Sequence, residues 1–223
     1  MVNRQALGRR NQIAKYGTWP DAVQKSDGNV WIRGAVPLAP RQTALLTPGE
    51  TWMTRFYHHE FEHVEDYLHH RSPYLMIDRI VSIDDRVVET VKRFTGEENF
   101  LKGHFPGLPI FPGAMMQEMS TQSAGVLIAA RYNPMFEYNT HEPDFNSHAL
   151  GVLVGVKRAK FRGFARPGDT LVARVVLQEI IDNLFDFSAT ISIGDRTIMR
   201  NAFQLTNVPS TVLRGESASG ATA

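Results

Sequence analysis

Four strand-like segments follow one another in the second half of the chain, and this run constrains the fold more than any other feature. Each is rich in Val, Ile, Leu or Phe, and they span residues 151–162, 170–181, 184–193 and 197–206. The links between them carry the turn signals Pro167-Gly168-Asp169, Asp182-Asn183 and Gly194-Asp195. In the segment 184–193, apolar residues alternate with Asp, Ser and Thr, as in a sheet that buries one face. We therefore predict four consecutive antiparallel strands.

Upstream of these strands the sequence predicts one hairpin and one long helix. The apolar run 74–83 and the Val- and Thr-rich run 86–95 flank Asp84-Asp85, which is typical of a turn. Residues 114–131 contain no proline and are rich in Met, Gln, Leu and Ala, which favours a helix. The order of hairpin, helix and four strands indicates an α+β fold. Because only one helix is available to cover the sheet, we expect the sheet to wrap around it.

The remaining segments carry weaker signals. Residues 1–65 contain all three tryptophans and scattered prolines without periodicity, so we assign them to an N-terminal extension of unknown role. Residues 209–223, which end in Ser, Gly and Ala, are expected to form a flexible tail. The stretch 132–149 is long and polar for a connection, so it is either a lid or wall beside a binding site or a plain surface insertion. The predicted hairpin, helix and strands form one domain, residues 66–208.

Composition excludes several classes of protein. The chain is 43% hydrophobic and 21% charged, as expected for a globular protein, and its net charge of +1 argues against binding nucleic acid. The absence of cysteine excludes disulfides, cysteine nucleophiles and thiolate zinc sites, and is compatible with a reducing compartment. No stretch is long and apolar enough to span a membrane, and no apolar run follows the basic N-terminal residues. We expect a cytoplasmic protein without membrane insertion.

The segment Gly103 to Gln122, GHFPGLPIFPGAMMQEMSTQ, concentrates the residues that can carry chemistry. His104 begins a loop in which three prolines fix backbone φ angles, so the loop can hold the imidazole still. Gly113 stands where the helix begins, and its amide is one of the unpaired donors that can approach a carbonyl oxygen. Glu118 follows five residues later, among small or polar neighbours on its face of the helix.

These three residues supply the roles that an elimination next to a thioester needs: a base, a donor to the carbonyl oxygen and an acid for the departing hydroxyl. A neutral histidine, with a pKa of about 6.5, is a suitable base at neutral pH. A glutamate, with a pKa of about 4.3, must be kept protonated by burial to act as the acid. We therefore predict that Glu118 is buried.

The same segment resembles the signature of the bacterial 3-hydroxyacyl-acyl-carrier-protein dehydratases of fatty-acid synthesis, and the resemblance covers residues 66–208. The matching motifs, in chain order, are His70-Arg71-Ser72-Pro73-Tyr74 with the apolar run to Asp78-Arg79, Gly103-His104-Phe105-Pro106, Pro112-Gly113, Glu118 with Gln122, Lys160-Phe161 and Pro167-Gly168-Asp169.

The resemblance implies a hotdog fold, in which an antiparallel sheet of about six strands wraps around one long central helix. It implies dehydration of (3R)-3-hydroxyacyl thioesters on an acyl carrier protein to trans-2-enoyl thioesters, without metal or cofactor. His104 is then the base, Glu118 the acid and Gly113 the carbonyl donor, while Phe105 and Gln122 bind substrate. The family also implies a homodimer with shared active sites, in which His104 faces the partner's Glu118, and assembly beyond the dimer stays open. Glutamate rather than aspartate at position 118 resembles the branch that does not isomerise the double bond.

Other functions stay open at this point. A hotdog thioesterase, or a relative that binds acyl thioesters without catalysis, would share the fold. The run His59-Glu60-Phe61-Glu62-His63 matches the H-E-x-x-H zinc-peptidase pattern, which requires a helix to bring both histidines to one face.

Charged residues outside the segment 103–122 also allow more than one interpretation. Arg158, Lys160 and Arg162 alternate along one strand, so they form either a solvated edge or a docking row for an acidic carrier protein. Arg71 and Asp78-Arg79 are interpreted as structural.

Overall fold

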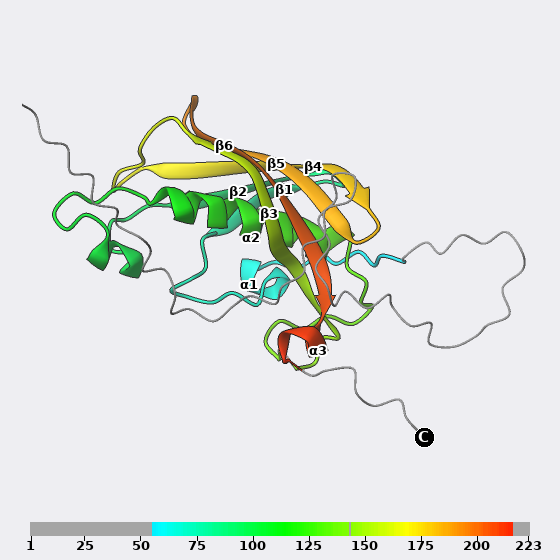
Figure 1. Ribbon diagram of the computed structural model, residues 1–223. Coiled ribbons are helices and arrows are strands. Elements are labelled where there is room, and N and C mark those ends of the chain that lie inside the picture. Colours follow the sequence, from blue (N-terminus) through cyan, green and yellow to red (C-terminus); the bar gives the residue numbers. More distant parts are fainter. Residues whose placement is uncertain (1–54, 143, 216–223) are drawn as a thin grey trace, which may run out of the picture. The chain divides into compact units, whose positions relative to one another are not determined.

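The structure is a computed structural model that describes residues 55–142 and 144–215 (Figure 1). Its elements are α1 (Val64–Tyr67), β1 (Arg79–Ile83), β2 (Val87–Arg93), the 3-10 turn η1 (Asn99–Gly103), α2 (Gly113–Arg131), β3 (His148–Phe161), β4 (Thr170–Ile181), β5 (Leu184–Ile193), β6 (Arg196–Pro209) and α3 (Ser210–Leu213). The predicted hairpin, long helix and four later strands are all present.

The strands form one six-stranded antiparallel sheet in the order β1-β2-β4-β5-β6-β3. Two-residue turns join β4 to β5 and β5 to β6, and Asp182 and Gly194 in these turns have φ angles of 55° and 54°. Positive φ at such positions suits the right-handed twist of a hairpin. These three strands form the meander that the turn signals predict.

The prediction that all four later strands are neighbours in sequence order is wrong for β3. This strand pairs with β6 at the edge of the sheet, and β4 pairs with β2 instead. The link at residues 162–169 is a loop of several residues rather than a tight turn, so it does not force β3 and β4 to pair as a hairpin. The consequence is that β3 leaves one long edge without a neighbouring strand in the described chain.

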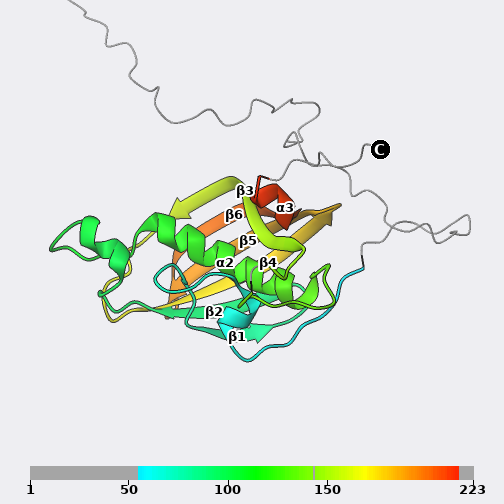
Figure 2. The same cartoon turned by 90° about the horizontal axis from the view of Figure 1, so that it is seen from below.

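The sheet curls over α2, which lies along its inner face (Figures 1 and 2). Every residue of α2 from Met119 to Ala130 is buried, including polar ones. A helix buried on all sides needs cover beyond the sheet. α1 and the neighbouring segment supply it from the other side, since α1 contacts α2. One helix inside a wrapped antiparallel sheet is the hotdog arrangement, and the predicted α+β hotdog fold is confirmed.

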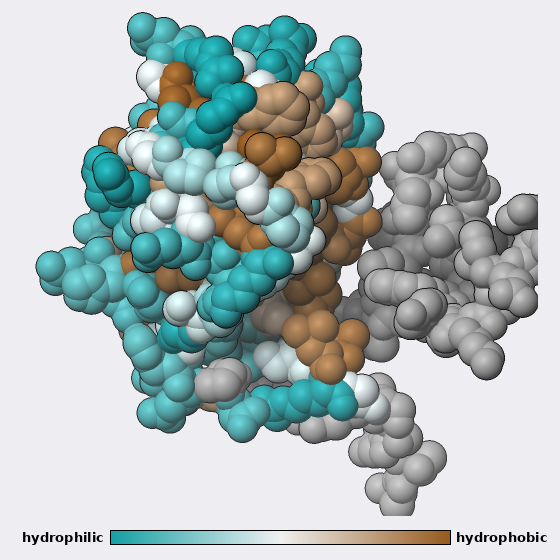
Figure 3. Space-filling model, turned by 90° about the vertical axis from the view of Figure 1, so that its left-hand side faces the viewer, coloured by the Kyte–Doolittle hydropathy of each residue, from teal (hydrophilic) through white to brown (hydrophobic). Residues whose placement is uncertain are grey.

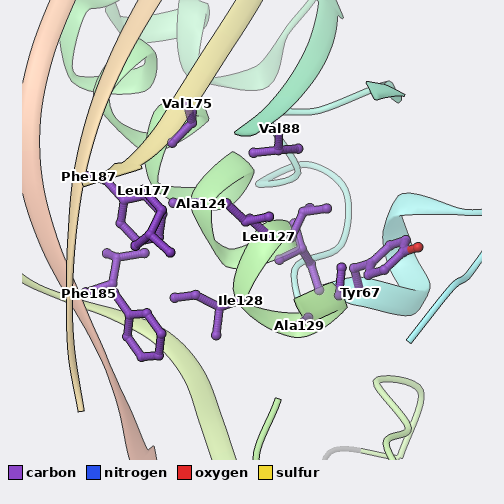
Figure 4. Close-up of a cluster of buried hydrophobic side chains, with 14 of the residues drawn as sticks. Tyr67, Val88, Ala124, Leu127, Ile128, Ala129, Val175, Leu177, Phe185 and Phe187 are labelled. Carbon is purple, nitrogen blue, oxygen red and sulfur yellow. The ribbon is translucent and has the colours of Figure 1, made fainter. Parts of the chain in front are cut away.

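The main core lies between α2 and the sheet (Figure 4). The predicted alternation in β5 is confirmed, because Phe185, Phe187, Ala189 and Ile191 are all buried. Tyr67 from α1 lies on the opposite side of α2 from Phe185 (Figure 4). The helix is therefore held between two apolar layers.

Both predicted domain boundaries need correction. Residues 55–65, assigned to the extension, belong to the folded domain: Phe56 and Phe61 pack against the core, and the Tyr57 amide donates to the Asn133 carbonyl at 2.8 Å. Residues 209–213, assigned to the flexible tail, complete β6 and form α3. The rest of the predicted extension, residues 1–54, and the end of the tail lie outside the described residues. Between residues 55 and 215, as far as they are described, no helix is long and apolar enough to cross a membrane.

Candidate active site

Glu118 lies in the first half of α2, beside a cavity of about 490 Å³. Thr121, Gln122 and Gly125 line the same cavity, because residues three, four and seven positions apart share one face of a helix. The Glu118 side chain is 17% exposed. The prediction of a buried carboxylate is therefore met only in part by the single chain: the group is largely covered, with its open side toward the cavity.

Gln122 holds the carboxylate in place. Its Nε2 donates to Glu118 Oε1 and to the Tyr74 carbonyl, both at 2.9 Å. Its Oε1 accepts from the Met76 amide at 2.8 Å. The side-chain amide of this buried residue is thus fully engaged by protein groups, and it ties α2 to the segment that precedes β1.

Two further residues lie beside Glu118 that the sequence analysis did not assign to the site. His70 Nε2 lies 3.8 Å from Glu118 Oε1, and the His70 ring stacks on Tyr74 with centroids 5.8 Å apart. Burial lowers the pKa of His70, the Glu118 carboxylate opposes this shift, and Arg71 reinforces it. Burial and the Glu118 charge raise the pKa of Tyr74. Glu118 therefore faces side chains that are uncharged at neutral pH.

The sequence signal that could have placed His70 and Tyr74 in the site was the motif that contains them. His70 and Tyr74 both belong to the run His-Arg-x-Pro-aromatic, which entered the sequence analysis only as part of the family resemblance. Its residues are some 45 positions before Glu118 in sequence, and only the fold brings them together.

His104 lies on the loop between η1 and α2, and this loop projects at one end of the domain (Figures 1 and 2). It follows η1 directly, and its amide donates to the Leu101 carbonyl at 3.2 Å. Phe105 and Gly107 then adopt φ angles of 51° and 82°, which reverse the chain. The imidazole Nδ1 is buried and has no hydrogen-bond partner among the described residues.

The loop of His104 opens onto a different cavity from that of Glu118. This second cavity, of about 650 Å³, is lined by Phe105, Leu108, Phe164 and neighbouring residues, with Arg166 as its charged member. Phe105 and Leu108 are 56% and 73% exposed. On the face drawn in Figure 3, hydrophobic residues gather toward the right of the domain, and the left part of the same face is mainly hydrophilic.

Within the described residues, no hydrogen bond or ion pair joins His104 to Glu118. The carboxylate's neighbours in the same chain include Gln122, His70 and Tyr74. One chain alone therefore does not assemble the pair that the sequence analysis singles out.

Gly113 is the first residue of α2, and Pro112 precedes it as the N-cap. The first amides of a helix have no acceptor within it, so the Gly113 amide is free to meet a carbonyl oxygen. A Cβ atom added to Gly113 would lie 3.0 Å from Cε1 of Phe161. Glycine here also lets the Phe161 ring from β3 pack against the start of the helix.

The predicted basic row is exposed. Arg158 and Lys160 lie on β3, and Arg162 follows the strand. Lys160 stands directly opposite Arg200 on β6, so two like charges face each other across the ladder. Lys157 is neutralised by an ion pair with Asp186. Within the described part of the chain, no ion pair compensates the positive charge of this row at the edge of the sheet.

The residues interpreted as structural have structural contacts. Arg71 donates to the main-chain carbonyls of Leu68 at 2.6 Å and Thr140 at 3.0 Å. Asp78 pairs with Lys92 at 2.7 Å and accepts from the Arg93 amide.

The H-E-x-x-H run does not have the geometry of a zinc peptidase. Residues 59–61 belong to no helix or strand and 62–63 form a bend, so the helix that would align the two histidines is missing. His59 Nε2 lies 3.0 Å from the Met135 carbonyl oxygen. Among the residues with described positions, no group of three His, Cys, Asp or Glu side chains could hold a metal ion.

Known proteins share both the sequence pattern and the architecture. Residues 68–201 match a family described as the FabA-like domain. A 3-hydroxyacyl-acyl-carrier-protein dehydratase, FabZ, from Desulfotalea psychrophila is 32% identical over 157 residues, which are 70% of this chain and 93% of that protein. The FabZ dehydratase of Verminephrobacter eiseniae is 31% identical over 129 residues, 57% of this chain and 80% of the relative.

Among solved structures, the dehydratase heterocomplex ApeI:P from Xenorhabdus doucetiae has a TM-score of 0.54 at 19% identity, covering 70% of this chain and 97% of that one. That likeness supports the fold. The match to the domain family and the identity with the two FabZ relatives go further: this chain belongs to the FabA-like family of 3-hydroxyacyl-acyl-carrier-protein dehydratases.

Proposed function

We propose that this protein dehydrates (3R)-3-hydroxyacyl thioesters, carried on an acyl carrier protein, to trans-2-enoyl thioesters in the biosynthesis of fatty acids or of related polyketides and lipids. Membership of the family supports this activity. The observation that carries the proposal is the largely covered Glu118 carboxylate, held by Gln122 at the side of a cavity on α2. As the sequence predicts, we place the reaction in the cytoplasm.

The chemistry uses one base, one acid and one donor. Neutral His104 takes the proton from C2, and the electron pair of that bond forms the C2–C3 double bond as the C3 hydroxyl leaves. Protonated Glu118 gives its proton to the leaving hydroxyl, which departs as water. The Gly113 amide donates to the thioester carbonyl oxygen, where charge builds during the reaction.

We infer that the acting pair comes from two chains. Glu118 lines one cavity, whereas the loop that follows His104 lines another, and the buried Nδ1 of His104 has no hydrogen-bond partner among the described residues. A second copy that brings its own projecting loop to the Glu118 cavity would complete both sites of a symmetric dimer. Phe105, exposed next to His104, would then contact the substrate or the partner's surface.

The carrier protein is proposed to dock on the row Arg158, Lys160 and Arg162. Exposed positive charge next to Arg200 suits an acidic protein surface. Charges of this kind mainly raise the rate of association and lose their effect at high salt.

The first test is turnover of a 3-hydroxyacyl carrier-protein substrate, followed by the absorbance of the enoyl thioester. We expect wild type to form product and both His104→Ala and Glu118→Gln to lose most of that activity, about a hundredfold or more, since each removes one proton-transfer group. Folding of each variant is checked by its thermal unfolding curve.

A hotdog thioesterase is the competing function, because it would use a carboxylate on the same helix to activate water. Assaying free thiol alongside the enoyl product separates the two. Release of thiol without enoyl formation by wild type would overturn the dehydratase proposal.

A further inference from the structure

The cavity beside Glu118 extends well beyond the carboxylate. Gly125, seven residues later, lies about 10 Å further along the helix axis, at the rise of an α-helix, and still lines it. Near Gly125 the lining is apolar: Leu68 lies next to it, and so does Gly151, whose neighbours Leu150 and Val152 line the cavity. The polar residues of the lining include Tyr138, Asp144, His148, Ser210 and Arg214. These come from segment 132–149, the first residue of β3 and the region of α3.

The described residues of segment 132–149, which exclude residue 143, are bonded to the chain around α1. Tyr138 Oη donates to the Tyr67 carbonyl at 2.8 Å, and Asn146 Nδ2 donates to His69 Nε2 at 2.8 Å. The Thr140 hydroxyl donates to the Glu65 carbonyl. Because several separate bonds fix this segment to the domain, it is a wall of the cavity and not a moving lid.

α3 and the residue that follows it also line the Glu118 cavity. Ser210 Oγ donates to the Asn146 carbonyl at 2.7 Å, and Arg214 pairs with Asp144 at 2.9 Å. The polar groups of this wall are thus paired with one another. Asn146 is buried, so an apolar chain that separated it from His69 and Ser210 would leave buried polar groups without a hydrogen bond, which is unfavourable.

We propose that segment 132–149 and α3 form a fixed polar end wall of the acyl-chain site, so that the enzyme selects short and medium 3-hydroxyacyl chains over long saturated ones. The inference rests on the proposed dehydratase function. Tyr138 is the specificity-determining residue of this wall, since its ring lines the cavity and its hydroxyl is anchored on Tyr67.

The test compares kcat/KM for carrier thioesters of 3-hydroxybutyrate, 3-hydroxyoctanoate and 3-hydroxypalmitate. We expect wild type to prefer the octanoyl over the palmitoyl substrate by at least about tenfold, a discrimination that a pocket of fixed shape achieves. Tyr138→Ala is expected to reduce this preference by removing part of the wall. Tyr138→Phe, which keeps the ring, should retain most of it.

The matched control is Phe136→Ala. Phe136 lies in the same segment but is 74% exposed and does not line the cavity, so this variant should keep the wild-type profile. Equal kcat/KM of wild type for octanoyl and palmitoyl substrates would overturn the inference and leave the dehydratase function standing, even if Tyr138→Ala fails to fold. A folded Tyr138→Ala variant with an unchanged profile would overturn the role of Tyr138. Absence of enoyl product from all three chains would overturn the proposed function, and the end wall with it.

Discussion

Gln122 is a buried side chain whose three hydrogen bonds all lead to groups around Glu118. The sequence analysis predicts that it binds substrate, which stays a prediction. Its contacts with Met76, Tyr74 and Glu118 favour a different role, in which it positions the carboxylate.

A Gln122→Leu variant separates these two roles. The change leaves the buried Met76 amide without its acceptor, so we expect the free energy of unfolding in urea to fall by about 1–3 kcal/mol. In steady-state kinetics we expect kcat to fall while KM changes little, because Gln122 would act through Glu118, the proposed catalytic acid. A raised KM with an unchanged kcat would instead identify Gln122 as a substrate ligand.

How far single residues can be predicted depends on how far apart in the chain their partners lie. His104, Gly113 and Glu118 fall within one short segment whose spacing carries the signal. The neighbours His70 and Tyr74 come from a distant segment, and nothing in their own residue types indicates that they meet Glu118. Contacts of that kind depend on the tertiary fold.

At the scale of elements, the close approach of α2 to β3 depends on two glycines. Gly151 has a φ angle of +68°, and a Cβ atom there would lie 3.2 Å from Cα of Gly125. We expect Gly151→Ala to lower the free energy of unfolding by about 2 kcal/mol or more, because alanine is strained at a positive φ angle and its Cβ atom would crowd Gly125. Urea denaturation measures this. Gly155→Ala is the control on the same strand, since its nearest neighbour is a side-chain atom at 3.5 Å, and an equal loss there would contradict the argument.

The end wall is expected to weaken in acid. His69 accepts a hydrogen bond from Asn146 in its neutral form, and its pKa is lowered by burial, then by Arg71 and His70. Between about pH 6.5, the ordinary value, and this lowered pKa, the unfolded chain binds more protons, so stability falls as the pH drops through that range. Above pH 6.5 the residue contributes no pH dependence.

The measurement is urea unfolding at a series of pH values for wild type and His69→Gln. The wild-type curve should lose more stability on acidification below about pH 6.5 than the variant. The same substitution at the exposed His63 controls for the loss of a histidine. Parallel curves for wild type and His69→Gln would contradict the assignment.

Elements were predictable where local signals are strong. Turn residues and alternation mark the strands β4, β5 and β6, and the lack of proline marks α2. The position of β3 beside β6 and the packing of residues 55–65 on α2 were missed, because both follow from how the sheet and helix bury their surfaces. A segment without periodicity can still be fixed by packing, as Phe56 and Phe61 are.

At the scale of the whole molecule, the single chain leaves surfaces that a second copy would cover. The edge strand β3 exposes Leu153, Val156 and Phe161 at 39%, 47% and 51%, and Phe164 follows at 56%. An unpaired edge strand with exposed apolar side chains is a ready site for pairing with another chain. A symmetric dimer there would cover these apolar side chains.

The shared active site of such a dimer can be tested by mixing two inactive variants. His104→Ala supplies an intact Glu118, and Glu118→Gln supplies an intact His104. If each site takes His104 from one chain and the partner's Glu118, a mixed dimer contains one complete site. Random exchange makes half of the dimers mixed, so after unfolding and refolding together the mixture should regain about a quarter of wild-type activity per chain. Each variant refolded alone is the control. If the mixture stays as inactive as the separate variants while sedimentation shows dimers, His104 and Glu118 must act within one chain, and the loop that carries His104 would have to move toward α2 of its own chain during catalysis.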